Sequence, residues 1–364
     1  MTATTIDGPV HTRSRSHRRW QARALPVAAA WSLAYLGLGI AWWAGAAGNP
    51  ADPSVDDAVG LSLLTVWGST TGAAMLTAVG GLGLVLAATM VARRRRVPIA
   101  LLPPRMTTVL GIALAVALAV LLPDFRLIAA IAYTPILLVL TLFGGTPGDV
   151  TLWPWPVVNM AVLSLAGLAW FVAVVEDAGR RRWEAADDGR DRIGHMSGVA
   201  ARWGRRATGL AVVLPLGYAV TRYAWALGIP LGVSPELLDE LGKGVYAGAG
   251  LATLGVLGAV LTLGLVQQWG EVFPRWMIGV RGRPVPVGLA VVPAAIVSVV
   301  VTSAGLMFVR LGITGRFAEN FPGGTSDVAA WLPEMFWPLW GAALAAATYA
   351  YWLRRRAGPP AGRS

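Results

Sequence analysis

The sequence predicts an all-α fold, a polytopic bundle of membrane helices, on three observations. Hydrophobic residues make up 55% of the chain and charged residues 13%, whereas soluble domains are usually about 25% charged. The charges are confined to short stretches between apolar runs, and these runs approach or exceed the ~20 residues that cross a bilayer. The same order of apolar runs and motifs also appears twice along the chain.

The repeat consists of matched positions at a nearly constant offset. Five residues of the first apolar run recur about 183 positions later with the same internal spacing: Leu33, Tyr35, Ala41, Trp42 and Gly45 match Leu216, Tyr218, Ala224, Trp225 and Gly228. Trp155 and Trp170 similarly match Trp337 and Trp352. Repeated matches at one offset predict a head-to-tail duplication of a single unit.

We expect about eight transmembrane helices, four in each copy. The apolar runs place them at roughly 24–44, 66–92, 105–122, 156–175, 207–227, 245–267, 286–309 and 334–353. Because each copy has an even number of spans, both copies enter and leave on the same side of the membrane. The predicted arrangement is a parallel 4+4 duplication about an axis along the membrane normal.

The domain organisation follows from these spans. The predicted units are a disordered cytoplasmic tail at 1–23, a first four-helix repeat at 24–175, an Arg-rich cytoplasmic linker at 176–206, a second four-helix repeat at 207–353 and a cytoplasmic tail at 354–364. The linker mixes acidic and basic residues, so we expect it to be solvated or partly helical.

Charge sets the predicted orientation. Arginines cluster in alternate connections, at 13–23, 93–105, 180–206, 275–283 and 354–356, whereas 45–65 and 228–244 are mainly acidic. Basic connections are typical of the cytoplasmic side, so both termini are expected there. The net charge of +11 is explained by this topology, and we expect contacts with the lipid bilayer and with anionic lipids at the Arg clusters rather than with nucleic acid.

One apolar segment, 127–143, does not fit the eight spans. If it crossed the membrane, the Arg-rich linker would lie outside, against the charge bias. Its counterpart in the second copy, 311–322, is short and polar. We therefore interpret 127–143 as a re-entrant or interfacial helix, bent at Pro135, with a further span as the alternative.

The candidate polar membrane site consists of Arg222, Tyr218, Asn159 and Glu334. Arg222 lies in an apolar run where the first copy has Gly39, and a charge at membrane depth costs about 2.5 kcal/mol or more. One interpretation is that Arg222 snorkels to the interface; the other is that it faces inward with Tyr218, one turn earlier. Glu334 suits a helix N-terminus or pairs with Arg222 or Arg310, and Asn159 is a candidate interhelical hydrogen-bond donor.

Two further groups carry weaker signals. The candidate external loops share a Gly-Gly-Thr sequence followed by Asp, and their residues are Gly144, Gly145, Thr146, Asp149, Gly323, Gly324, Thr325 and Asp327. They are expected either to cap the next helix or to form paired binding loops. The candidate helix-packing residues are Gly68, Gly72, Gly244 and Gly248, two pairs at the four-residue spacing that lets helices approach closely.

The residues favour no catalytic chemistry. The chain has no Cys and only three His, and no phosphate-binding, nucleotide-binding or zinc motif is present. We therefore expect neither an enzyme nor a bound cofactor or metal.

The run Tyr-Ala-Trp-Ala-Leu-Gly-Ile-Pro-Leu-Gly at 223–232 gives the only family resemblance. The whole chain resembles polytopic integral membrane proteins of high-GC actinobacteria to which no activity is assigned. The resemblance implies a location in a bacterial plasma membrane and nothing about substrate. Two functions stay open: a transporter-like or permease-like protein with a site between the repeats, or a non-transporting scaffold, sensor or accessory subunit.

Overall fold

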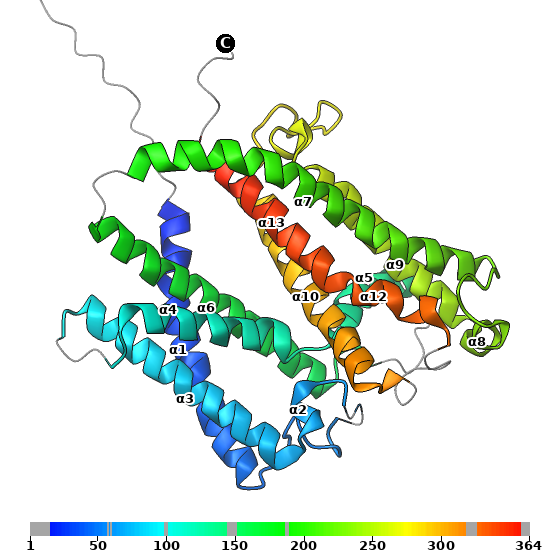
Figure 1. Cartoon of the computed structure of the whole chain (residues 1–364), viewed down its shortest axis with the longest axis horizontal. Helices are drawn as coiled ribbons and strands as arrows, with labels where there is room; N and C mark the ends of the chain where they lie inside the picture. The colour runs from blue at the N-terminus through cyan, green and yellow to red at the C-terminus, as the bar shows by residue number, and fades with distance from the viewer. Residues whose placement is uncertain are drawn as a thin grey trace, which may run out of the picture.

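The chain forms an assembly of long helices in a computed structural model that describes residues 15–56, 58, 60–97, 101–143, 151–185, 189–317 and 326–357. Within these residues the only β-structure is an isolated bridge between Val272 and Pro284. The long helices within residues 15–121 and 155–185 gather on one side of the molecule, whereas the helix at 125–142 lies beside helices of the second half of the sequence (Figure 1).

The first half contains four long helical units. They are α1 (Arg15–Trp43), α3 (Ser69–Arg94), α4 (Pro104–Val116) continued by the π-helical turn η1 (Ala117–Leu121), and α6 (Trp155–Ala185); α2 (Leu63–Val66) and α5 (Phe125–Leu142) lie between them in sequence. Helix α1 packs on α3 and α6, and α4 packs on α6.

The second half has a corresponding set. Its long helices are α7 (Gly189–Ala226), α9 (Gly244–Leu263), α10 (Val287–Thr314) and α13 (Trp337–Ala357), with the short elements α8 (Pro235–Leu241), η2 (Gln268–Gly270), η3 (Val328–Ala330) and α12 (Leu332–Met335). Helix α7 packs on α9 and α13, and α10 packs on α13. Red α13 therefore lies between α7 and orange α10 (Figure 1).

Six helices of the described chain are long and apolar enough to cross a membrane: Arg23–Trp43, Ser69–Arg94, Pro104–Leu121, Trp155–Arg181, Gly244–Leu263 and Val287–Thr314. These coincide with six of the eight expected spans. The other two expected spans fall in α7 and α13, which are less apolar because α7 contains Arg222 and α13 is rich in Trp, Tyr and Ala. The fold is compatible with an integral membrane protein.

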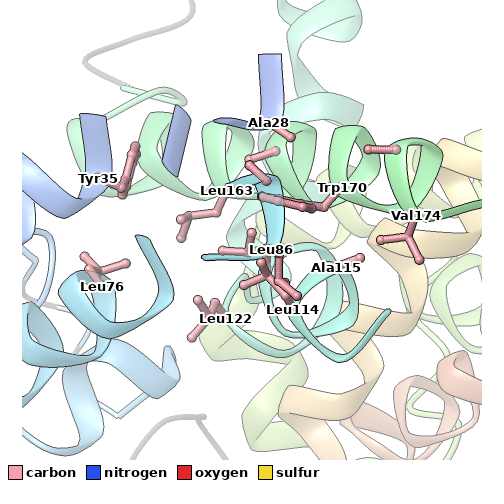
Figure 2. Packing of buried hydrophobic residues seen from close by; sticks show 14 of the residues in the cluster. Ala28, Tyr35, Leu76, Leu86, Leu114, Ala115, Leu122, Leu163, Trp170 and Val174 are labelled. Carbon is pink, nitrogen blue, oxygen red and sulfur yellow. The ribbon is translucent and has the colours of Figure 1, made fainter. Parts of the chain in front are cut away.

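Each half has its own apolar core. In the first, Trp170 of α6 is fully buried and lies over Leu86 and Leu114 (Figure 2). Its indole Nε1 donates a hydrogen bond to Ser32 Oγ at 3.3 Å. In the second, Tyr351 of α13 is fully buried and its hydroxyl donates to the Gly270 carbonyl at 2.7 Å. Each large aromatic thus has its polar atom satisfied, as burial requires.

Two of the four glycines expected at close contacts lie at such contacts. A Cβ on Gly68 or Gly244 would meet nothing within 4 Å. A Cβ on Gly72 would meet Ala51 and the Leu64 carbonyl. A Cβ on Gly248 would lie 3.4 Å from Arg222 Cδ. Gly68 instead adopts φ +85° at the N-terminal cap of α3. Gly72 and Gly248 therefore lie at close contacts, Gly248 with a side chain of α7, whereas Gly68 and Gly244 do not. The four-residue spacing thus located only one close contact in each pair.

One segment expectation changes. Helix α1 begins at Arg15, so part of the stretch expected to be a disordered tail is helical. The linker 176–206, expected to be solvated or partly helical, is helical over its described residues, because α6 continues to Ala185 and the 38-residue α7 starts at Gly189. Helix α5 covers the disputed segment 127–143 and is packed on α10, with further contacts to α6 and α9.

Candidate functional site

Arg222 is buried inside the second half. It lies near the end of α7, and only 6% of its surface is exposed. The interpretation that it snorkels to the membrane interface is therefore wrong, because its guanidinium is directed toward other helices and lies among protein groups. A buried cation requires a compensating charge and hydrogen-bond acceptors.

The compensating charge comes from Glu334 of α12. Arg222 Nη2 forms an ion pair with the Glu334 carboxylate, whose residue is 5% exposed. The guanidinium also donates to two backbone carbonyls of η3, through Nη1 to Ala329 at 3.0 Å and through Nη2 to Ala330 at 3.2 Å. Three acceptors on two short consecutive elements thus hold one side chain of α7.

Two aromatic rings complete the surroundings of the cation. The Arg222 guanidinium carbon lies 4.6 Å from the centroid of the Tyr218 ring and 4.1 Å from that of Trp225. Both distances are within the range of a cation–π interaction, which is strengthened by exclusion from water. Trp337 packs edge-on against Tyr218 with ring centroids 5.5 Å apart, so α13 closes the site behind the tyrosine.

The site retains unused hydrogen-bonding capacity. Within the described residues, Glu334 Oε2, Trp331 Nε1 and Trp337 Nε1 are buried without a hydrogen-bond partner. Buried polar atoms are nearly always paired, so each unpaired one calls for a physical reason. The free carboxylate oxygen of Glu334 can accept a hydrogen bond or a proton, and each indole N–H can donate a hydrogen bond to a small polar guest.

Asn159 lies elsewhere, in the first half. Tyr35 of α1 donates its hydroxyl hydrogen to Asn159 Oδ1 of α6 at 2.6 Å. Asn159 is thus the acceptor in this interhelical bond rather than the donor, and its Nδ2 is buried without a partner in the described structure. The candidate site from the sequence therefore divides into two: Tyr218, Arg222 and Glu334 in one half, and Asn159 with Tyr35 in the other.

Gly39 and Arg222, which the sequence match pairs, differ in how their helices pack. Where α7 carries Arg222, α1 carries Gly39, and a Cβ on Gly39 would lie 2.7 Å from Thr77 N of α3. In the second half, the Arg222 side chain passes Gly248 of α9. The two positions that the sequence match pairs thus have different surroundings, a close approach of α1 and α3 at Gly39 and a buried charge at Arg222.

The candidate external loops lie mostly outside the described residues. Gly144, Gly145, Thr146, Asp149, Gly323, Gly324 and Thr325 fall in that part of the chain. Asp327 is described: it is 2% exposed and its Oδ1 accepts from the Ser234 backbone N–H at 2.5 Å. Asp327 thereby joins the segment before η3 to the N-terminal cap of α8.

Sequence reasoning missed a second buried charge cluster, formed by Asp56, Asp124 and Arg126. Arg126 at the start of α5 contacts Asp56 Oδ1 at 2.5 Å and Asp124 Oδ2 at 2.7 Å, and both carboxylates are almost fully buried. This cluster fixes the 45–62 connection onto α5. The only sequence signal was the presence of Asp and Arg at the ends of apolar runs.

These two clusters differ in their suitability for function. The Arg126 cluster has two carboxylates on one guanidinium and resembles a structural clamp, whereas the Arg222 cluster lies in an apolar bundle and leaves buried polar atoms unpaired among the described residues. No protein-family model, curated protein or solved structure matches the chain.

Proposed function

We propose that this chain is a permease-like integral membrane protein of a bacterial plasma membrane, built from two parallel four-helix halves, and that Arg222 and Glu334 form its polar centre. The observation that carries the proposal is the burial of the Arg222–Glu334 ion pair between α7 and α12. Ionisable residues inside membrane segments are costly and usually mark pathways for ions, protons or solutes.

The packing of the helices supports the proposed duplication. Helices α1, α3, α4 and α6 contact one another in the same pattern as α7, α9, α10 and α13: the first member packs on the second and fourth, and the third packs on the fourth. Under the proposed topology both termini and the α6–α7 connection are cytoplasmic, in keeping with the positive-inside rule.

The chemistry of the pair supports a role in solute passage. A guanidinium held by one carboxylate and two carbonyls can exchange the carboxylate for an anionic group of a solute, since Arg binds planar anions in the same geometry. Glu334 would then keep its unpaired oxygen as an acceptor for a cationic group or a proton. The solute class that fits is a small molecule carrying an anionic group.

The test is solute flux in proteoliposomes and in a deletion strain, with profiling of small anionic and zwitterionic solutes. We expect deletion to change the flux of at least one such solute, and Arg222→Ala and Glu334→Gln to abolish its transport by the purified protein. Asn159→Leu is the matched control, because it removes a buried polar side chain from the other half without changing a charge. Unchanged fluxes on deletion, or full transport by folded Arg222→Ala protein, would overturn the proposal.

The alternative is a non-transporting scaffold or accessory subunit, and one surface favours it. The connection 264–286 presents Trp276 and Ile278 with 77% and 97% of their surfaces exposed, beside Arg275, Arg281 and Arg283. Exposed apolar side chains outside spans are typical of interaction sites. Loss of localisation of a co-purifying protein on deletion, with no change in any flux, would favour this alternative.

A further inference from the structure

A groove runs between the two halves, away from the Arg222 site. Its volume is about 290 Å³, and its walls come from η1 and α2 of the first half and from α10 of the second. Leu63, Leu121, Leu306 and Met307 contribute to an almost wholly apolar lining. Leu121 and Ile313 at the edges are 44% and 81% exposed, so the groove opens onto the surface that lipid would cover.

One charged side chain, Arg310 of α10, lies in this apolar lining. Its Nη2 donates to the backbone carbonyls of Gly60 and Leu61. In the described part of the chain, Arg310 has no carboxylate within ion-pair distance, and its Nη1 and Nε have no acceptor. The nearby carboxylates of Asp56 and Asp124 are both engaged by Arg126.

A second guanidinium, that of Arg316, lies on the same turn as the Arg310 acceptors. The guanidinium of Arg316, just after α10, lies against Gly60. A Cβ on Gly60 would be 3.1 Å from both Nη1 and Nη2 of Arg316. The Gly60 carbonyl is also an acceptor for Arg310. Two guanidinium groups therefore converge on one turn of the 45–62 connection, where Gly60 has the positive φ of +88° that permits the approach.

We propose that this groove binds an anionic phospholipid, with one acyl chain along the apolar walls and the phosphate on Arg310. Apolar walls suit an acyl chain, and an Arg with free donors at the end of those walls suits a phosphate, which accepts hydrogen bonds from a guanidinium fork. Basic pockets between membrane helices bind anionic headgroups by the same principle. The lipid would bridge the two halves, and this inference does not depend on transport.

The absence of Cys from the chain makes a direct test feasible. Leu306→Cys introduces a single thiol in the groove, which is labelled with bimane and reconstituted in vesicles of phosphatidylcholine containing dibrominated phosphatidylglycerol or dibrominated phosphatidylcholine. Bromine quenches the probe only on contact. Both lipids carry a phosphate, but the choline of the neutral lipid offsets its negative charge. We therefore expect the anionic lipid to reach half-maximal quenching at a mole fraction at least about fivefold lower than the neutral lipid, since the attraction between an Arg and an anionic headgroup contributes ~1 kcal/mol.

Three comparisons make the result decisive. Leu257→Cys, at an exposed apolar position of α9, should show no preference between the two lipids. Adding Arg310→Gln to Leu306→Cys should remove the preference, whereas Arg275→Gln, which removes a charge from the 264–286 connection, should leave it intact. Equal quenching by both lipids at Leu306→Cys would overturn the proposal, as would loss of the preference in millimolar inorganic phosphate. Both measurements use protein with Arg310 intact, so neither depends on the folding of the Arg310 variant.

Discussion

At the scale of single residues, Arg222 is informative because it stands where the other half has Gly39. Both positions lie where the first helix of a half passes the second, and each half has a tyrosine one turn earlier, Tyr35 or Tyr218. In the first half that tyrosine binds a neutral amide, Asn159. In the second it faces a guanidinium. Under the proposed duplication, the charge is an addition to a shared scaffold, which is where a specialised site is expected.

The ion pair makes a prediction about stability. Arg222→Met or Glu334→Leu alone should lower the free energy of unfolding in detergent by about 3–5 kcal/mol, because each leaves an uncompensated buried charge. The double variant should recover most of this loss, because the remaining groups are apolar. A double-mutant cycle from thermal or denaturant unfolding measures the coupling. Additive single losses would show that the two side chains are not paired.

The sequence identified Arg222, Tyr218 and Glu334 because charged and phenolic groups are conspicuous in apolar runs. The sequence could not show that Asn159 lies beside Tyr35 rather than beside Arg222, because the neighbour of Asn159 depends on which helices pack together. It also gave no sign that Arg126 would meet Asp56, 70 positions earlier, because no local periodicity connects a loop carboxylate with a helix start.

At the scale of helices, close approach depends on a few glycines at crossings. A Cβ on Gly80 of α3 would lie 2.5 Å from Leu36 N and 2.8 Å from the Ser32 carbonyl of α1. A Cβ on Gly167 of α6 would lie 2.7 Å from the Ala115 carbonyl of α4. Backbone atoms cannot move aside individually, so these contacts set the helix spacing.

Gly80→Ala should therefore force α1 and α3 apart and lower the stability by about 1–3 kcal/mol. The matched control is Gly37→Ala in α1, where a Cβ would meet nothing within 4 Å; it should be neutral or stabilising by up to about 1 kcal/mol. Unfolding midpoints in the same detergent compare the two variants. Equal midpoints would mean that the α1–α3 crossing tolerates a methyl group.

The sequence could not select these glycines, because the chain contains 44 of them and many four-residue spacings arise by composition alone. It did locate the long helices, since an apolar run of sufficient length is a strong signal. The ends were less predictable: α6 and α7 continue into the charged connection because Arg, Glu and Ala favour helix as well in water as in lipid.

At the scale of the whole molecule, the two halves and their orientation yield a topological prediction. The segments 45–62 and 227–243 should face one side of the membrane, and the connection 264–286 the other. With single cysteines, an impermeant maleimide added to intact cells should label Ser54→Cys and Glu236→Cys, and should label Arg275→Cys only after permeabilisation. Labelling of Arg275→Cys in intact cells would reverse the proposed orientation.

The all-helical architecture with several membrane-length helices was predictable from composition and apolar runs, whereas the contacts between the first and second halves of the chain were not. Apolar runs define helices individually, but the seam is formed by loop carbonyls at Gly60 and Leu61 meeting Arg310, and by α5 packing on α10. Such contacts join segments that lie far apart in sequence. Their geometry depends on the exact ends of helices, which periodicity defines least well.

The π-helical turn η1 changes the direction in which residues after Leu121 leave the third helix of the first half. An uninterrupted α-helix would place these residues at a different angle about the helix axis. There the Leu122 N–H reaches back five residues to the Ala117 carbonyl, at 3.0 Å, which is the signature of one inserted residue. Removing one residue from 117–121 would restore regular winding and rotate the chain beyond Leu121 by about 100°. Leu122 would then turn its carbonyl away from the Ser62 hydroxyl, and Asp124 and Arg126 would face a new direction. The direction in which the chain leaves the first half thus depends on this one turn.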